Sequence, residues 1–376
     1  MFFQSPNRPF VAICISVLCA STAFADKPSK PVGGGGSGKG GGPAFSIVSL
    51  DDVGGLIANG RANDVNDLRQ VVGSVSSNGS NAATIWTITQ TNGSHQSTLA
   101  LLAGGESANS INDDGEIVGT TKDQAGNLTG LYWPSASADP IALPTPPGFD
   151  ESSAASISNS GIICGKVGLA GEGWDADRAV VWRVLFESGV PVVGLPVELP
   201  GPVDGSRATG VNDNDEMGLA QVVGIYEATQ TAVLWDVLSV PDGSVIVAPA
   251  AEVLDFGAQA ADVNNSGVAC GQRGVEAVVW SSGSPTVLDR PAKGKQSVPR
   301  AAAWAISDTG TIVGAAGDLT NSRACYWDTS SGSLRFLDSY LSSNSSLGGL
   351  SSANGVNEHG VIVGDGWYGA FIAIPN

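Results

Sequence analysis

The side chains that most often perform catalysis are scarce in this chain, whereas carboxylates are abundant. The sequence has 2 His against 36 Asp and Glu. His359 precedes a glycine in a turn pattern, His95 lies in a polar stretch, and neither stands near a nucleophile or a set of metal ligands. We therefore expect no Ser-His-Asp triad, no histidine metal site and no cofactor. The glycine-rich stretch 33–42 is not followed by a helical pattern, so it does not predict a phosphate-binding loop.

Two acidic segments, 112–116 and 212–216, are the strongest candidates for metal chemistry. Both concentrate Asn, Asp and Glu within five residues, and Ca²⁺ requires several oxygen ligands close together. Neither segment has EF-hand spacing, and the same residues are ordinary turn formers. A purely structural turn is therefore the main interpretation. Calcium binding is the alternative, with the candidate ligands Asp113, Asp114, Glu116, Asp213 and Asp215.

Three tryptophans are candidates for a ligand-binding face. Trp174 lies between acidic residues in an insertion, Trp304 follows a repeated alanine, and Trp367 lies near the end of the chain. A loop aromatic can stack on a sugar or on a partner side chain, and loops on a rigid scaffold often carry binding function. The alternative is that these side chains only fill space.

The elements that would position these residues come from a phrase that occurs seven times. Each copy has an Ala, a Val or Ile three residues later, an Asn or Ser anchor, and a Gly that closes an apolar run. The anchors are separated by 46, 46, 54, 52, 43 and 50 residues and are Asn66, Asn112, Ser158, Asn212, Asn264, Ser307 and Asn357. A framework tryptophan follows each of the first six copies, at Trp86, Trp133, Trp182, Trp235, Trp280 and Trp327. Units of about 40–50 residues match four-stranded propeller blades better than leucine-rich or ankyrin units.

Within a copy, four short β-rich runs are separated by Asn, Asp and Gly, which predicts an antiparallel meander. In the fifth copy the runs are 260–263, 268–271, 277–280 and 286–288. We expect the anchor to cap the turn between the first two strands and a Gly to supply its positive φ. The repeated Ala is small because innermost strands converge near an axis, and the Trp packs between blades.

The two ends of the repeat region predict a closed ring. The seventh copy stops after its third strand at 370–374, and residues 45–50 resemble a fourth strand without predecessors. Pairing these two segments removes both exposed edges. The sequence therefore predicts an all-β, seven-bladed propeller of four-stranded antiparallel blades, in which residues 45–50 close the last blade. An open β-solenoid is the alternative.

At this point the repeats resemble the bacterial extracellular HAF repeat family. That family combines a Leu-Gly strand end, an Ala, an Ile/Val-Asn-x-x-Gly-x-Val-Val-Gly segment and a His-Ala-Phe-like strand ending in Trp. Segments 49–55, 71–73, 111–115, 117–119 and 370–372 fit this pattern, and the match covers about residues 45–376. The resemblance implies a secreted, propeller-like protein without an established biochemical role. The chain departs from the family at the eponymous His, where it has Thr231, Glu276, Ala324 and Gly369.

The remaining segments predict export. Arg8 precedes an apolar run at 10–20, and Ala23-Phe24-Ala25 offers a cleavage site, which predicts a signal peptide at 1–25. The run is shorter than the about 20 residues of a spanning helix, although a retained anchor is an alternative. Residues 26–43 are a Gly/Pro-rich flexible linker, and 44–376 is the repeat domain. We expect a periplasmic, cell-surface or extracellular protein.

The net charge limits the classes of partner, and the positions of the cysteines bear on disulfides. A formal net charge of −18 argues against nucleic acid and anionic lipid, which require a basic surface. Two of the five cysteines lie in the signal peptide, and Cys164, Cys270 and Cys325 are expected as small core residues without a disulfide.

Two function classes remain open. The first is a secreted, monomeric, non-enzymatic scaffold that binds an unidentified protein or glycan. The second is a carbohydrate-active enzyme, glycosidase-like or lyase-like, with paired carboxylates in the propeller channel.

Overall fold

The computed structural model describes the repeat domain, and Pro43–Asn376 forms one compact unit. The signal peptide and the linker predicted at 1–25 and 26–43 lie outside the described residues. The described residues are 45–50, 60–77, 79–91, 94–201, 205–213, 218–240, 243–291, 299–318, 321–328, 332–343 and 345–376.

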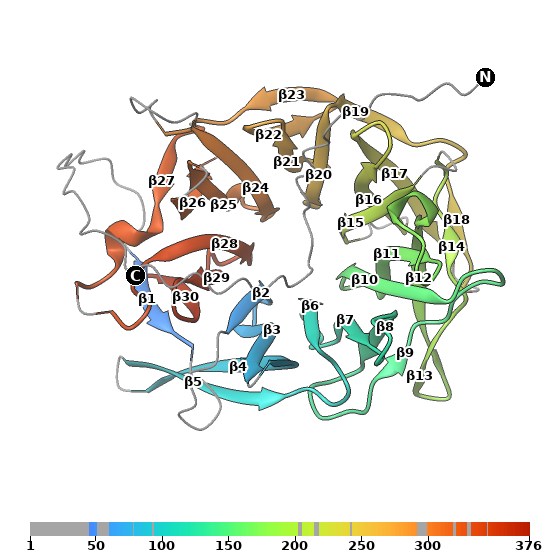
Figure 1. Cartoon of the computed structure of the whole chain (residues 1–376), viewed down its shortest axis with the longest axis horizontal. Helices are drawn as coiled ribbons and strands as arrows, with labels where there is room; N and C mark the ends of the chain where they lie inside the picture. Colours follow the sequence, from blue (N-terminus) through green and yellow to red (C-terminus); the bar gives the residue numbers. More distant parts are fainter. Residues whose placement is uncertain are drawn as a thin grey trace, which may run out of the picture. The chain divides into compact units, whose positions relative to one another are not determined.

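Within that part of the chain, the strands form seven antiparallel sheets that follow one another around an axis (Figure 1). Blade one consists of β2 (Arg61–Val65), β3 (Gln70–Ser77), β4 (Ser80–Thr91) and β5 (Ser94–Leu101). Blade two consists of β6 (Ser107–Ile111), β7 (Ile117–Lys122), β8 (Leu128–Trp133) and β9 (Ile141–Ala142). Blade three consists of β10 (Glu151–Ile157), β11 (Ile162–Gly168) and β12 (Arg178–Glu187), with β13 (Val190–Val193) and β14 (Val197–Glu198) both paired to β12.

Blade four also has a divided outer strand. It consists of β15 (Ser206–Val211), β16 (Leu219–Tyr226) and β17 (Thr231–Ser239), with β18 (Val245–Val247) and β19 (Glu252–Phe256) both paired to β17. Blade five consists of β20 (Ala258–Val263), β21 (Ala269–Arg273), β22 (Glu276–Ser281) and β23 (Ser284–Val287). Blade six consists of β24 (Arg300–Ile306), β25 (Thr311–Gly317), β26 (Ser322–Asp328) and β27 (Leu334–Phe336).

Blade seven joins the two ends of the domain. Its strands β28 (Leu350–Val356), β29 (Ile362–Gly366) and β30 (Ala370–Pro375) are completed by β1 (Phe45–Ser49), which pairs antiparallel with β30. The predicted seven-bladed propeller with an N-terminal closing strand is therefore confirmed, and the open solenoid is wrong.

The closing glycine of each copy is required by the shape of the innermost strand. Each innermost strand changes register directly after the repeated Ala, as in a β-bulge, and that Ala pairs with the closing Gly. A Cβ on the glycine would lie 1.9–2.1 Å from the carbonyl oxygen that precedes the Ala, so only Gly fits. This holds for Gly73, Gly119, Gly165, Gly224, Gly271, Gly314 and Gly364.

The framework tryptophans fill the space between blades, as the repeat predicts. All six are at most 1% exposed. Indole N–H groups reach back to the outer end of the preceding blade: Trp182 donates to the Pro144 carbonyl at 2.8 Å, and Trp327 donates to the Asp289 carbonyl at 2.7 Å. Each framework position thus joins its blade to the one before it.

The anchors cap their own turns. In four of the five Asn copies the side-chain oxygen accepts the backbone N–H four residues on, as from Glu116 to Asn112 at 2.9 Å, and Ser158 does the same for Ile162 at 3.1 Å. Asn212 instead accepts the N–H of Gln221, nine residues on, because this copy carries an insertion. Gly115 takes the expected positive φ of 79°. The predicted turn is confirmed.

The anchor amides also connect neighbouring blades, which the sequence analysis did not anticipate. The Asn264 amide donates to the Ser307 carbonyl of the next blade at 3.1 Å, and the Asn357 amide donates to the Asn66 carbonyl at 3.0 Å, across the junction of blades seven and one. Ser158 and Ser307 have no amide with which to make this bond.

The residue directly after each anchor makes a second set of hydrogen bonds between blades. Its backbone N–H donates to a side-chain oxygen of the equivalent residue in the next blade, at 2.5–3.1 Å. The set is a closed circle of Asp67, Asp113, Asn159, Asp213, Asn265, Asp308 and Glu358. We call it the carboxylate–amide ring. It explains why every copy has Asp, Asn or Glu at this position.

Two substitutions of Asn264 can separate the stability contributed by the cap from that contributed by the bond between blades. Asn264→Ser should keep the cap but lose the amide donor to Ser307, and should cost about 1–2 kcal/mol of unfolding free energy. Asn264→Ala loses both and should cost about twice as much. Urea unfolding of the two variants measures the difference, and equal costs would mean that the amide contributes nothing to stability.

Candidate functional site

The blade geometry creates two unlike faces. The seven anchors, at which the first turns begin, lie on one face, which we call the anchor face. Because strand direction alternates within a blade, the second turns and the blade-to-blade connections lie on the opposite face, which we call the connection face. The face and the blade on which a candidate residue lies determine which other candidates it can contact.

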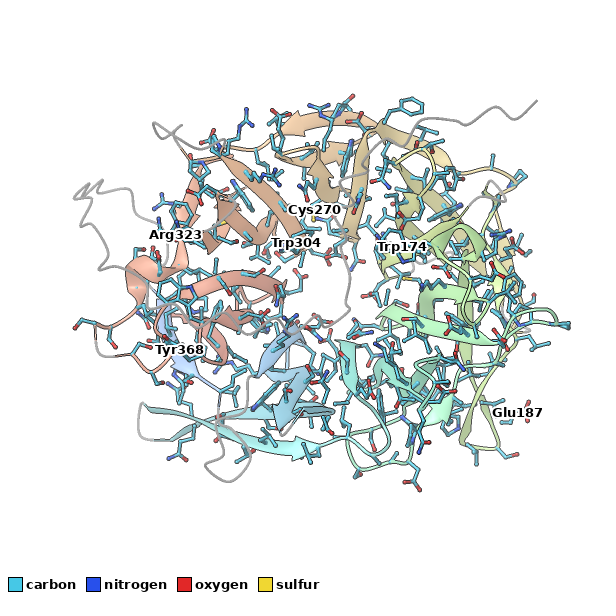
Figure 2. All side chains as sticks on the ribbon, viewed as in Figure 1. Trp174, Glu187, Cys270, Trp304, Arg323 and Tyr368 are labelled. Atoms are coloured by element: carbon cyan, nitrogen blue, oxygen red, sulfur yellow. The ribbon has the colours of Figure 1, made fainter. Side chains whose placement is uncertain are left out.

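Trp174 and Trp367 both lie on the connection face but in separate blades. Trp174 begins the 3₁₀ turn Trp174–Ala176 between β11 and β12 and is 46% exposed. Trp367 lies between β29 and β30 and is 52% exposed, beside Tyr368 at 61%. Figure 2 shows Trp174 and Tyr368 on different sides of the ring. The structure therefore makes Trp367 and Tyr368 one pair and leaves Trp174 alone.

The Trp367–Tyr368 pair is exposed and yet held in place. The Trp367 backbone N–H donates to the Gly349 carbonyl at 3.0 Å. A Cβ on Gly349 would lie 2.7 Å from the Trp367 ring, and one on Gly348 would lie 2.6 Å from the Tyr368 ring. These glycines let both aromatic rings lie directly on the backbone. Sequence reasoning missed Tyr368, although the Gly-Gly pair and the adjacent aromatics were visible.

Trp304 lies on the innermost strand of blade six, β24, and is half-buried (Figure 2). It is the extra residue of the bulge after Ala303. In blade seven the same position is Asn354, whose amide donates to the Ala62 carbonyl of blade one at 2.9 Å. Trp304 replaces such a polar link with an apolar surface near the axis, and it lies in a different blade from each of the other two candidate tryptophans.

The carboxylates of the calcium alternative have structural partners. Asp113 and Asp213 belong to the carboxylate–amide ring, and the buried Glu116 accepts from the Asn112 amide at 2.7 Å and the Tyr132 hydroxyl at 2.5 Å. Asp114 is exposed, and Asp215 lies outside the described residues. Over the described part of the chain, no group of three or more His, Cys, Asp or Glu is placed to hold a metal ion. Calcium binding stays a prediction, and these bonds favour the turn interpretation.

The histidines and cysteines lie in unreactive places. His359 Nε2 is 4.0 Å from Asp67 Oδ2 at an exposed turn, and His95 lies on the outer strand β5. Cys164, Cys270 and Cys325 are buried free thiols, as expected, and burial raises the pKa of each. A thiol of raised pKa is a poor nucleophile.

Two carboxylates of the innermost strands were missed by the sequence analysis. Asp64 and Asp262 stand two residues before the anchors of blades one and five. Asp64 Oδ2 accepts the Ile111 N–H at 3.0 Å, and Asp262 Oδ2 accepts the Ile306 N–H at 3.0 Å, each from the next blade. Burial raises the pKa of Asp262 to about 7, and the Asp64 carboxylate adds to the shift. Burial raises the pKa of Asp64 as well.

These shifts predict a pH dependence of stability. With a pKa of about 7, the folded domain holds the Asp262 proton up to that pH, whereas an unfolded Asp releases it near its ordinary pKa of 3.8. The folded state therefore binds more protons between these values, and stability must fall as pH rises through them. The unfolding temperature should be higher at pH 5 than at pH 8.

Asp262→Asn should flatten this slope, because its side chain cannot titrate. The comparison is a pair of thermal unfolding series from pH 5 to pH 8, with Asp123→Asn as an exposed control outside the innermost strands. If Asp262→Asn keeps the full slope, the dependence comes from other carboxylates.

Comparison with known proteins gives structural likeness only. No protein-family model matches the chain, and no curated protein matches it significantly. The WD40 propeller domain of Doa1 is 16% identical, with a TM-score of 0.43 over 88% of this chain and 96% of that one. The extracellular domain of the putative hybrid two-component system BT3049 from B. thetaiotaomicron is 13% identical, with a TM-score of 0.49 over 89% of this chain and 41% of that one.

The Dos1 propeller is similar at 12% identity, with a TM-score of 0.47 over 88% of this chain and 95% of that one. These likenesses concern architecture alone. The described residues contain no helix that is both long and apolar enough to cross a bilayer.

Proposed function

We propose that this chain is an exported, monomeric, non-enzymatic scaffold that binds a protein or a glycan on its connection face. The observation that carries the proposal is the Trp367–Tyr368 pair, which is exposed on both rings and fixed against Gly348 and Gly349. Ordering a binding side chain in advance lowers the entropy lost when a ligand is bound. Aromatic anchors are also the side chains that contribute most at binding surfaces.

The rest of the ring supports a scaffold role. The carboxylate–amide ring, the anchor amides and the framework tryptophans all join neighbouring blades, so the turns are held by a stiff frame. Loops on a rigid frame can vary their side chains without loss of the fold. The HAF resemblance and the predicted signal peptide support export, which cell fractionation and mass spectrometry of the mature N-terminus would test.

A carbohydrate-active enzyme is the second candidate, and Asp64 with Asp262 is the observation that favours it. Both are carboxylates of raised pKa on innermost strands, as a general acid requires. Their oxygens, however, accept backbone N–H groups from the next blade. We therefore favour a structural role for both, and the scaffold over the enzyme.

The test is a glycan array and a pull-down with residues 44–376, repeated with Trp367→Ala and Tyr368→Ala. We expect a bound glycan or protein that is lost in both variants. Trp174→Ala is the matched control, because it is a similarly exposed tryptophan on the same face of another blade. Retention of every ligand by the Trp367 and Tyr368 variants would contradict the proposal.

A further inference from the structure

A cavity of about 480 Å³ opens on the anchor face between blades two and three. Its walls come from the first turns of both blades, around Asp114 and Asn159–Gly161, and from the end of β12 at Arg183–Phe186. Its volume falls within the about 300–1,000 Å³ that small-ligand pockets occupy. It lies on the opposite face from Trp367 and Tyr368 and is separate from the site of the proposed function.

Arg183 is the unusual residue of this cavity. Its Nε and Nη1 atoms are closed off from solvent, and neither has a hydrogen-bond partner among the described residues. None of the ion pairs within the described part of the chain includes Arg183. Arg183 as a residue is half-buried, so it borders the cavity while two of its guanidinium nitrogens have no partner. A buried donor without an acceptor is costly, so the arrangement favours an anion from outside the chain.

The buried carboxylate on the cavity wall does not fill that role. Glu116 lines the same cavity, but its two oxygens accept from Asn112 and Tyr132. Burial, followed by the Glu116 bond, raises the pKa of Tyr132, so the phenol stays a neutral donor to that carboxylate. Glu116 is therefore held by blade two and is not a counterion for Arg183.

The backbone around Arg183 is fixed on both sides. The Arg183 carbonyl accepts the Gly194 N–H at 3.0 Å, and the following N–H, of Val184, donates to the Gly161 carbonyl at 2.9 Å. Arg183 also pairs with Ile162 in the sheet. The side chain therefore extends from a rigid strand, which is the condition for a preorganised binding group.

The residues at the mouth of the cavity indicate which class of anion would fit. Phe186 is 65% exposed at the rim, Pro134 adds a second apolar wall, and Asp114 is an exposed carboxylate. A sugar ring presents an apolar C–H face to an aromatic ring and hydroxyl donors to a carboxylate, and a uronate adds a carboxylate for the guanidinium. With a net charge of −18, the whole chain repels polyanions, which favours a ligand with a single carboxylate.

We propose that this cavity binds the uronic acid residue of an otherwise neutral glycan, with Arg183 on the uronate carboxylate, Phe186 against the ring face and Asp114 on a hydroxyl. The probe is a disaccharide of glucuronic acid and a neutral sugar, titrated into residues 44–376 by calorimetry and ligand-detected NMR. Its carboxyl-reduced counterpart is the matched ligand control, because it differs only at the group that meets Arg183.

Arg183→Met should weaken binding of the disaccharide by about tenfold or more, the usual effect of losing a charge-assisted hydrogen bond. The reduced disaccharide should bind with similar weakness to both proteins. Arg178→Met is the matched protein control, because Arg178 lies on the same strand but pairs with Glu198. Without ligand, Arg183→Met should unfold at the same or a higher temperature, which a purely structural arginine would not allow.

Phe186→Ala removes an exposed ring and keeps the test open if the Arg183 variant is poorly folded. It should weaken disaccharide binding several-fold, whereas Trp367→Ala and Tyr368→Ala should leave it unchanged. Equal affinity for the acidic and reduced sugars, no binding by the unaltered domain, or unaltered binding by Arg183→Met would overturn the proposal. Tighter binding of a short peptide with a free terminal carboxylate would overturn it in favour of a peptide site.

Discussion

A chain that begins at residue 52 should fail to fold, whereas one that begins at residue 44 should be as stable as the full domain. Both deletions remove the predicted signal peptide and linker, and they differ only in β1 and its flanks. β1 supplies the outer strand of blade seven and pairs with β30 over Phe45–Ser49. The longer deletion therefore leaves β30 as an open edge.

The lost segment also carries core side chains, one in β1 and one directly after it. Phe45 is 6% exposed and packs in the cluster that contains Leu337 and Phe371, with edge-to-face contacts to Tyr326 and Tyr340. Leu50 is equally buried, in the cluster around Trp86. Removal of a buried Phe costs about 3–5 kcal/mol and of a buried Leu about 2–5 kcal/mol, which together match the whole stability of a typical domain.

Circular dichroism and thermal unfolding of the two deletions would test this expectation. A synthetic peptide of residues 44–51, added to the shorter chain, is the control. It tests whether non-covalent pairing with β30 is enough to restore the fold. Recovery of the β spectrum on addition of the peptide would support the closure argument. A cooperative transition in the shorter chain without the peptide would contradict it.

The repeat made the ring predictable because each copy of the pattern constrains the same structural unit. Spacing of the anchors and framework tryptophans predicted blades, and the incomplete seventh copy predicted their closure. The β-bulge was not predicted, since an extra residue in one strand leaves no signature in hydrophobic alternation. The closing Gly was its visible consequence, but the reason appears only when Ala154 and Gly165 are seen paired.

The candidate sites were predicted less well, and for a physical reason. Most links from the anchors and the positions that follow them join residues 43–54 positions apart, such as Asn264 with Ser307, and no local pattern reports such a contact. The carboxylate–amide ring was nonetheless recoverable, because the position after every anchor bears a side-chain oxygen. Arg183 could not be found in this way. It is notable because the described fold supplies no hydrogen-bond acceptor for two of its nitrogens, and a sequence pattern cannot show that.

Trp280→Ala should cost about 3–5 kcal/mol of unfolding free energy, the usual range for emptying a buried aromatic site. The ring is 1% exposed and packs between blades four and five, against Val223 and Leu254 on one side and Val278 on the other. Its Nε1 also lies 3.5 Å from Asp255 Oδ2. Loss of this side chain therefore opens a cavity at a junction of the ring rather than within one sheet.

Trp174→Ala is the matched change, with the same atoms removed and a different surrounding. Trp174 lies in the short turn between β11 and β12 and is 46% exposed, so the cost should be under about 1 kcal/mol, as for surface positions. Urea unfolding of both variants at one pH gives the comparison. Because the two residues differ in burial and in repeat position together, a large cost at Trp174 would mean that the insertion of blade three packs against the ring. Trp174 would then be a structural residue, and the sequence-based prediction that it lies on a ligand-binding face would be wrong.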